Sequence, residues 1–349
     1  MRTARSWRVT LRRSVAADPV RAALLTTLPT RHLPVRVVPD PRPGPGELLV
    51  AVSTCGICGT DLHILEGDSY RPELPFVLGH EPVGRVVAAG DEVDQGWIGQ
   101  RVTMTLFRGE GACARCLAGD ERLCADLISI TGVMGAWGGF AELLVVGAGR
   151  VLPVPDSVED AAAASLVDAG ATAANSVRNA PVPQGALTVI VGGGPVGHFA
   201  AELLRDAQRR YIVVQPSEAR RDALTRNGHA VVALAQEIEE APAAVIDAAG
   251  APGILPWALD ALTPQGIYVA AGYGLVDGLD LAPAARKELV IRGVRSGRRD
   301  DLALMIELVA TGRVRVPPIS VWPLGSIDDA LHALRAREVP GKAVIDVRS

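Results

Sequence analysis

The feature that most constrains the fold of this 349-residue chain is a glycine-rich segment at residues 189–197, VIVGGGPVG. Its glycines form the pattern G-x-G-x-x-G directly after an apolar, strand-like run, and apolar residues then recur at helical spacing. This strand-turn-helix pattern predicts a Rossmann-type unit, in which a pyrophosphate lies at the positive N-terminus of the helix. A glycine-rich turn without a ligand is the alternative. The residues predicted to bind the cofactor there are Gly192, Gly194, Pro195, Val196 and Gly197.

The chain divides into two parts of different composition. Up to residue 152, glycine, proline and β-branched residues dominate, with strand-like runs such as residues 83–88. After an alanine-rich helical segment, strand-like and helix-like segments alternate over residues 187–294. A last helix is expected at residues 326–335, before a strand at residues 343–347. We therefore predict an α/β chain, with a β-rich unit followed by a doubly wound parallel sheet covered by helices.

The end of the second strand of this sheet bears on the choice of nicotinamide cofactor. An NAD site usually has an acidic residue there, which accepts hydrogen bonds from the ribose hydroxyls, whereas this chain has Gln215. A neutral side chain removes the repulsion that a carboxylate exerts on a 2′-phosphate. Ser217, Arg220 and Arg221 follow and could hold that phosphate, so we expect NADP to be favoured over NAD. An arginine packed over the adenine of NAD is the alternative.

Residues suited to metal binding and proton transfer lie in the N-terminal half. Cys58 opens the run CGTDLH, which contains Thr60 and ends at His63, and His80 follows in the run GHE. A thiolate and an imidazole are suitable zinc ligands, and the hydroxyl of Thr60 and the imidazole of His63 could carry a proton outward. The pattern indicates a zinc site.

Taken together, these motifs resemble the zinc-dependent medium-chain alcohol dehydrogenase/reductase family. The resemblance extends from about Arg21 to the C-terminus and also includes GGFAE at residues 138–142 and KELVIRG at residues 287–293. It implies a GroES-like catalytic domain whose sequence is split around a Rossmann domain, with the active site in the cleft between them. The implied domains are a catalytic domain at 21–168 and 312–349 and a Rossmann domain at 169–311. Residues 1–20 precede the resemblance and are rich in arginine, so we expect a disordered extension there, with a targeting segment as the alternative.

The resemblance also implies the members of the active site. Asp168 is the residue in register for the third zinc ligand, and Asp61 would orient another ligand from outside the metal shell. Alternatively, Asp168 caps a helix, and Glu81 or a water molecule completes the zinc site. The implied catalytic set is Cys58, Thr60, His63, His80 and Asp168, of which Cys58, His80 and Asp168 hold the catalytic zinc.

A second, structural zinc is implied for the family's cysteine-rich lobe, in which four cysteines follow the spacing C-x-x-C-x-x-C-x(7)-C. Here Cys113, Cys116 and Cys124 fill the last three positions, and Glu110 stands in the first. A carboxylate is a competent zinc ligand, although one thiolate fewer weakens the site. A reduced, metal-free loop is the alternative. Cys55 has no assigned role, and a rival zinc ribbon would join Cys55, Cys58, Cys113 and Cys116.

The function implied by the resemblance is hydride transfer between a nicotinamide cofactor and an alcohol or carbonyl substrate, with zinc acting as a Lewis acid. A secondary alcohol, a polyol or a biosynthetic intermediate would suit the reaction. Two other classes remain open at this point. One is a zinc-free quinone or enone reductase of the same fold, and the other is a non-catalytic member of the fold.

Composition restricts the partners and the compartment. The net charge is −4, no dense basic block occurs, and no apolar run reaches the ~18 residues of a membrane span, so neither nucleic acid nor a membrane is an expected partner. Five clustered cysteines without a secretion signal favour a cytoplasmic protein. The apolar strands at residues 266–271 and 289–294 end the nucleotide sheet, and exposed edges of this kind tend to be covered. They resemble the strands that continue one sheet across a two-fold axis in this family, which implies a homodimer or homotetramer.

Overall fold

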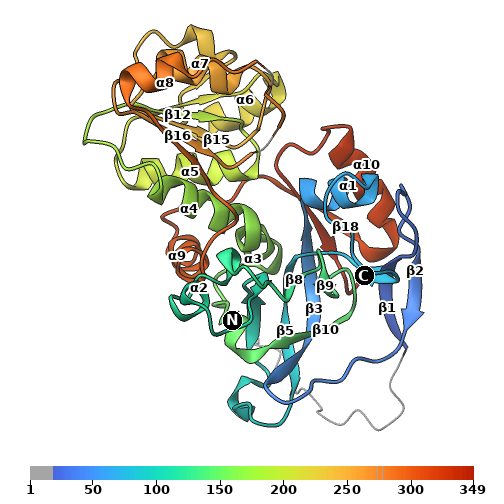
Figure 1. Cartoon of the computed structure of the whole chain (residues 1–349). Helices are drawn as coiled ribbons and strands as arrows, with labels where there is room; N and C mark the ends of the chain where they lie inside the picture. Colours follow the sequence, from blue (N-terminus) through green and yellow to red (C-terminus); the bar gives the residue numbers. More distant parts are fainter. Residues whose placement is uncertain (1–18, 273, 277) are drawn as a thin grey trace, which may run out of the picture.

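The computed structural model describes residues 19–272, 274–276 and 278–349 (Figure 1). Residues 1–18, most of the N-terminal extension predicted at residues 1–20, lie outside the described residues. Strand β1 (Val20–Leu25) begins at the last residue of that predicted extension, so Val20 belongs to the folded part. Figure 1 shows a β-rich half at one end of the molecule and a second sheet with its helices at the other. Helices α3 (Asp160–Ser165) and α4 (Ala171–Arg178) lie between the two halves.

The β-rich half is organised around the long strand β3 (Glu47–Ile57). β3 pairs antiparallel with β5 (Glu81–Ala89), β10 (Leu143–Gly147) and β19 (Lys342–Asp346). Partly exposed and buried residues alternate along the first part of β3, as expected for a strand with one face on a core. The seven-stranded sheet is completed by β6 (Arg101–Met104), β11 (Val151–Pro153) and β18 (Ile319–Pro323).

Within the described residues, this half also contains two three-stranded sheets and further helices. β1 lies between β2 and β4 in one small sheet, and β8 lies between β7 and β9 in the other. The bounds are β2 (Val35–Val38), β4 (Phe76–Val77), β7 (Phe107–Arg108), β8 (Ser129–Thr131), β9 (Gly135–Ala136), α1 (Gly59–Glu66), α2 (Ala114–Leu117) and α10 (Ile327–Arg335).

The second sheet has six strands in the order β14-β13-β12-β15-β16-β17, and every pairing in it is parallel. Chain order reverses beside β12, where a doubly wound sheet places its ligand. The predicted α/β fold is therefore confirmed. The bounds are β12 (Thr188–Val191), α5 (Pro195–Asp206), β13 (Tyr211–Val214), α6 (Glu218–Arg226), β14 (Val231–Val232), β15 (Ala244–Asp247), α7 (Ile254–Ala261), β16 (Ile267–Ala270), α8 (Ala282–Lys287) and β17 (Val290–Gly293).

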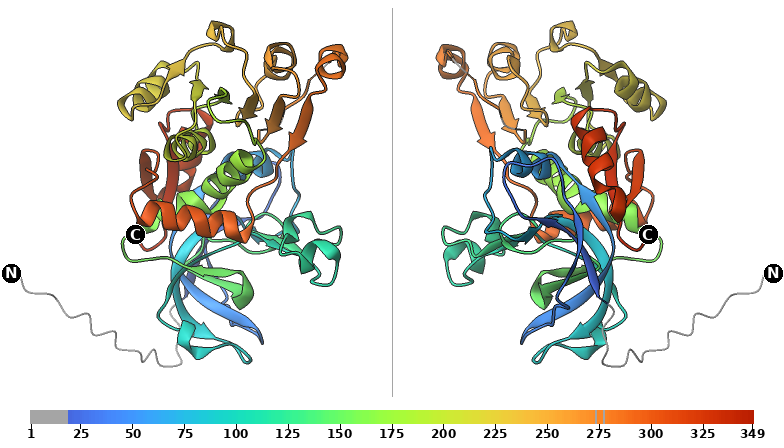
Figure 2. Two further views of the ribbon diagram at one scale, coloured as in Figure 1. Left: turned by 90° about the vertical axis from the view of Figure 1, so that its left-hand side faces the viewer. Right: turned by 90° about the vertical axis from the view of Figure 1, so that its right-hand side faces the viewer.

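The chain crosses between the halves twice. On the way out, α3 continues through a π-helical turn, Leu166–Gly170, into α4. On the way back, α9 (Arg299–Ala310) packs on α4, and the last strands rejoin the sheet of β3 (Figure 2). Both crossings bring residues from distant parts of the sequence to the junction. Among the described residues, no helix combines the length and apolar character needed to cross a bilayer.

Candidate active site

A cavity of about 640 Å³ lies at the junction, lined by residues of both halves. Its lining includes residues of the CGTDLH and GHE runs, the π-helical turn and the first turn of α5. The strand ends of the parallel sheet contribute Ala248, Ala271 and Val294. One cavity therefore contacts both the predicted metal-binding residues and the start of the nucleotide-binding helix.

Four predicted donors converge in this cavity: Cys58, His80, Glu81 and Asp168, whose ligand atoms lie within 4.8 Å of one another. Cys58 precedes α1, and the pair His80 and Glu81 lies where β5 begins. Asp168 lies in the π-helical turn, which excludes its alternative role as the cap of an ordinary helix start. The group thus depends on three chain segments that meet only in the folded protein.

The spacing and chemistry of these donors fit a zinc ion. Tetrahedral zinc with bonds of ~2.0 to 2.3 Å sets its ligand atoms ~3.3 to 3.8 Å apart. The oxygen Oδ2 of Asp168 lies 3.6 Å from the sulfur of Cys58 and 3.8 Å from Nε2 of His80. His80 is almost fully buried, yet neither ring nitrogen has a hydrogen-bond partner among the described residues. A bound cation would satisfy such a nitrogen.

The electrostatics of the group favour a cation as well. Although burial opposes protonation, the carboxylate of Asp61 raises the pKa of His80 well above its ordinary value, and Asp168 adds to the shift. Burial likewise opposes ionisation of Asp168, but His80 lowers the pKa of Asp168 to about 2. Asp61 is fully buried, lies 3.4 Å from Nδ1 of His80 and accepts a hydrogen bond from the backbone N–H of Cys58. Asp61 therefore lies beside His80 and holds the backbone of Cys58, which is the place of a residue that orients metal ligands.

Glu81 has a partner that the sequence did not reveal. Its carboxylate forms an ion pair of 2.5 Å with Nζ of Lys342 on β19, and both side chains are buried. Burial alone would lower the pKa of Lys342, but Glu81 and the negative charges of Cys58 and Asp168 raise it. A cation thus stands beside the donor group. The register of β19 beside β3, which places Lys342 there, could not be read from the sequence.

The predicted relay residues lie on α1 at the edge of the cavity. The hydroxyl of Thr60 is 3.7 Å from the sulfur of Cys58. His63, one helical turn further on, is about half exposed and lies 3.2 Å from both carboxylate oxygens of Asp68. Both residues line the cavity. The helix therefore extends from the donor group to solvent.

The glycine-rich loop has the geometry of a phosphate cradle. Gly192 has φ +97°, a backbone conformation that favours glycine. A Cβ at Gly197 would collide with the carbonyl oxygen of Gly192, so this position also requires glycine. A Cβ at Gly194 would meet no neighbouring atom, so the loop is open where α5 begins. Pro195 and Val196, the first residues of α5, line the cavity. The residues fit a dinucleotide pyrophosphate at this helix N-terminus.

Of the residues after β13 that were predicted to bind the cofactor, only Arg220 lines the cavity. Gln215 is buried and accepts a hydrogen bond of 2.9 Å from the backbone N–H of Ser217. Ser217 is exposed and makes no side-chain cap of α6, although it occupies the N-cap position. Arg220 lines the cavity, and its Nη2 donates to the carbonyl oxygen of Val339. Arg221 instead donates to carbonyl oxygens at the end of β13, outside the cavity lining.

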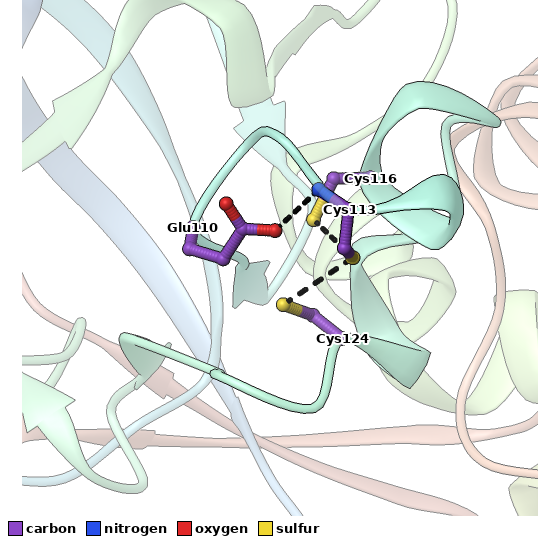
Figure 3. A group of neighbouring side chains, drawn as sticks. All are labelled: Glu110, Cys113, Cys116 and Cys124. Atoms are coloured by element: carbon purple, nitrogen blue, oxygen red, sulfur yellow. Dashed lines mark hydrogen bonds between the residues drawn. The ribbon is translucent and has the colours of Figure 1, made fainter.

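The cysteine-rich lobe forms a second donor group (Figure 3). Sγ of Cys113 lies 3.5 Å from Sγ of Cys116 and 3.8 Å from Sγ of Cys124. The carboxylate of Glu110 completes a group with ligand atoms within 4.8 Å, and it also accepts backbone N–H groups of Ala112 and Cys113. The sulfur separations suit tetrahedral Zn–S bonds of ~2.3 Å. This group also fits zinc.

Cys55 belongs to neither group, which contradicts the rival zinc ribbon. Its side chain is fully buried in the core of the β-rich half, and burial raises the pKa of its thiol. Cys58 lies in the cavity group, whereas Cys113 and Cys116 lie in the lobe. Cys55 is a packing residue.

Comparison with known proteins agrees with this architecture. Residues 44–156 match the alcohol dehydrogenase GroES-like domain, and residues 195–311 match the zinc-binding dehydrogenase family. The probable alcohol dehydrogenase AdhA of Mycobacterium tuberculosis is 34% identical over 342 residues, covering 93% of this chain and 95% of that protein.

Two solved structures show the same fold over nearly the whole chain. The acetophenone reductase of Geotrichum candidum, solved with NAD, has a TM-score of 0.87 at 25% identity and covers 95% of this chain and 98% of its own. A cobalt- and zinc-bound alcohol dehydrogenase of Pyrobaculum aerophilum has a TM-score of 0.86 at 27% identity, covering 95% of this chain and 100% of its own.

The chain belongs to the zinc-dependent medium-chain alcohol dehydrogenase/reductase family, as its motifs predicted. It is an oxidoreductase of the nicotinamide-dependent alcohol dehydrogenase class.

Proposed function

We propose that this enzyme transfers a hydride between a nicotinamide cofactor and a small secondary alcohol or its ketone in the described cavity. The observation that carries the proposal is that Cys58, His80 and Asp168 converge in the same cavity as the first turn of α5. The catalytic unit comprises residues 21–168 and 312–349, and the nucleotide-binding unit comprises residues 169–311. The pairing of β19 with β3 supports this split.

Each side chain has a distinct task in this proposal. Cys58, His80 and Asp168 hold zinc, and Glu81 stays with Lys342 as a neighbouring ion pair. Zinc supplies Lewis acidity toward the substrate oxygen. The hydroxyl of Thr60 exchanges the substrate proton and passes it along α1 to His63 at the solvent edge.

For the cofactor we propose NADP in preference to NAD. Gln215 places no carboxylate at the end of β13, and the guanidinium of Arg220 reaches the cavity there. Arg337 adds positive charge near Arg220, since together with burial it lowers the pKa of Arg220. A 2′-phosphate therefore meets positive charge and the exposed hydroxyl of Ser217.

The test is a screen of alcohols and carbonyls with both cofactors, followed through nicotinamide absorbance. We expect turnover of secondary alcohols or ketones and a higher kcat/KM with NADP. Gln215→Asp should keep the acceptor for the N–H of Ser217 but repel the phosphate, which shifts the preference toward NAD by about 10- to 100-fold. A wild-type preference for NAD would contradict the cofactor assignment, and turnover restricted to enones would contradict the reaction.

We further propose a homodimer or a dimer of dimers that works in the cytoplasm. Strand β17 ends the parallel sheet, and Val290 and Ile291 are 38% and 46% exposed. Such an edge favours pairing with a second copy. None of the five cysteines forms a disulfide, which suits a reducing compartment. Light scattering should give a mass well above the 36.5 kDa of one chain.

A further inference from the structure

The cavity wall contains an arginine that the proposed reaction does not use. Arg295 follows β17, is partly buried and lines the cavity. The β-rich half faces it with Tyr70 and Phe107, which line the same cavity. Arg295 therefore lies where the substrate side of the cavity meets the parallel sheet.

Neutral groups hold its guanidinium in place. The Cζ atom lies 4.8 Å from the ring centroid of Phe107. Nη1 donates a hydrogen bond of 2.9 Å to the carbonyl oxygen of Arg122, and Nη2 donates one of 3.0 Å to the hydroxyl of Tyr70. A guanidinium has five N–H donors, so several remain for a ligand. The group is preorganised and retains donor capacity.

Its charge is not neutralised within the part of the chain that the structure describes, since no carboxylate there forms an ion pair with Arg295. The nearby acid, Asp120, is buried and bound by Arg122 at 2.8 Å and by Arg298 at 3.0 Å. Lys342, another cation of the cavity, is paired with Glu81. This corner of the cavity therefore carries excess positive charge.

The position of Arg295 relative to the donor group limits what it can bind. Arg295 and the next residue, Ser296, line the cavity together with Asp168 of the donor group. Arg220, on the nucleotide side, lies beside Val339 instead. An anion at Arg295 would thus belong to the substrate rather than to the adenosine phosphate.

We propose that Arg295 is a specificity-determining residue that binds a carboxylate carried by the alcohol or carbonyl substrate. A single planar guanidinium with unused N–H groups matches a carboxylate, which it can bind with two parallel hydrogen bonds. The substrate class is then a hydroxy acid or oxo acid. This inference rests on the proposed function for the reaction but not for the anion site itself.

The kinetic test compares matched acids and esters. Reduction of 4-oxopentanoate and 5-oxohexanoate is measured against their methyl esters, which keep the ketone and lose the charge. The wild type should prefer at least one acid. Arg295→Gln should lower the acid-to-ester ratio of kcat/KM by about 10- to 100-fold, chiefly through KM for the acid. Arg295→Lys should recover part of the ratio, because it restores the charge without the planar fork.

Arg298→Gln is the matched control, since Arg298 lies three residues further on, is bound to Asp120 and is outside the cavity lining. It should leave the acid-to-ester ratio within about twofold of the wild type, within the scatter expected for a remote charge. Equal losses for acid and ester in Arg295→Gln, or a ratio that both variants lower alike, would overturn the proposal.

A binding measurement separates this inference from the proposed reaction. Calorimetry with pentanoate and pentanamide, on wild type and Arg295→Gln, needs no turnover. Selective binding of pentanoate that is lost in Arg295→Gln supports the anion site, whether or not a ketone is reduced. If no ketone is reduced while this binding is seen, the anion site stands and the proposed hydride-transfer reaction is refuted. Ketone reduction without Arg295-dependent selectivity in either assay leaves the reaction standing and refutes the anion site.

Discussion

The two donor groups contain similar chemistry in opposite surroundings. Cys58, His80, Glu81 and Asp168 come from three separate segments and surround a cavity between the halves. Glu110, Cys113, Cys116 and Cys124 come from fifteen consecutive residues of a surface lobe, where Leu117 is 77% exposed. The first group exists only when folding brings its three segments together, whereas the second can form from one loop.

This difference separates a reactive site from a structural one. The cavity group is accompanied by buried charges, Asp61 and Lys342, that orient its donors and balance its charge. In the lobe, backbone N–H groups orient the donors instead. The N–H groups of Ala112 and Cys113 donate hydrogen bonds to the carboxylate of Glu110, and the N–H of Glu110 lowers the pKa of Cys124. We infer that the lobe group stabilises its loop and does not contact the substrate.

The largest expected effect is that of Cys58→Ser. Loss of this thiolate should remove the cavity zinc and the several kcal/mol of transition-state stabilisation that it supplies, so kcat should fall by roughly 10⁴-fold or more. Metal analysis should find about one ion fewer per chain than in the wild type, and cofactor binding should persist. Wild-type activity in Cys58→Ser would show that the cavity group is not the reactive one.

Thr60→Ala tests whether the surroundings of the cavity group transfer protons. The hydroxyl, 3.7 Å from the sulfur of Cys58, is not a member of the donor group. Its removal should slow a proton-coupled step by ~10²- to 10⁴-fold while the metal content stays that of the wild type. The measurement is kcat as a function of pH. An unchanged rate and pH profile would refute the relay.

Cys116→Ser applies the same change to the lobe and should produce a different result. We expect about one ion fewer per chain and faster proteolysis of the lobe, because metal binding and local folding are coupled. Activity should fall several-fold at most, far less than in Cys58→Ser, since the lobe group does not line the cavity. A loss of kcat as large as that of Cys58→Ser would show that the two groups are not separable.

What the sequence could predict follows the same division. The glycine-rich loop is a local pattern whose residues could be named from spacing alone, and the alternation of strands and helices predicted the parallel sheet. The lobe cysteines are clustered in the sequence, but their grouping with Glu110 needed the spacing of the resembled family. Asp168 needed the family resemblance, because nothing local marks it as a neighbour of His80. Lys342 and Arg295 could not be predicted, since the first depends on the register of β19 and the second on how a loop after β17 faces Phe107.

The smallest expected effect comes from Glu110→Cys, which changes the lobe from three thiolates and a carboxylate to four thiolates. Softer ligands suit zinc better, so release of the lobe zinc to a chelator should slow by about tenfold. The same change removes the carboxylate that accepts the N–H groups of Ala112 and Cys113, so the metal-free loop should be proteolysed faster than in the wild type.

Glu110→Gln is the control, because an amide oxygen can still accept a backbone N–H but the charge is gone. Its lobe zinc should leave faster than in the wild type, whereas its metal-free loop should resist protease better than that of Glu110→Cys. The wild type and the two variants thus rank differently in the two assays if Glu110 serves both as a metal ligand and as a backbone acceptor. If zinc release were the same in all three, Glu110 would be a loop-capping residue alone, and the lobe would hold its metal through the three sulfurs and water.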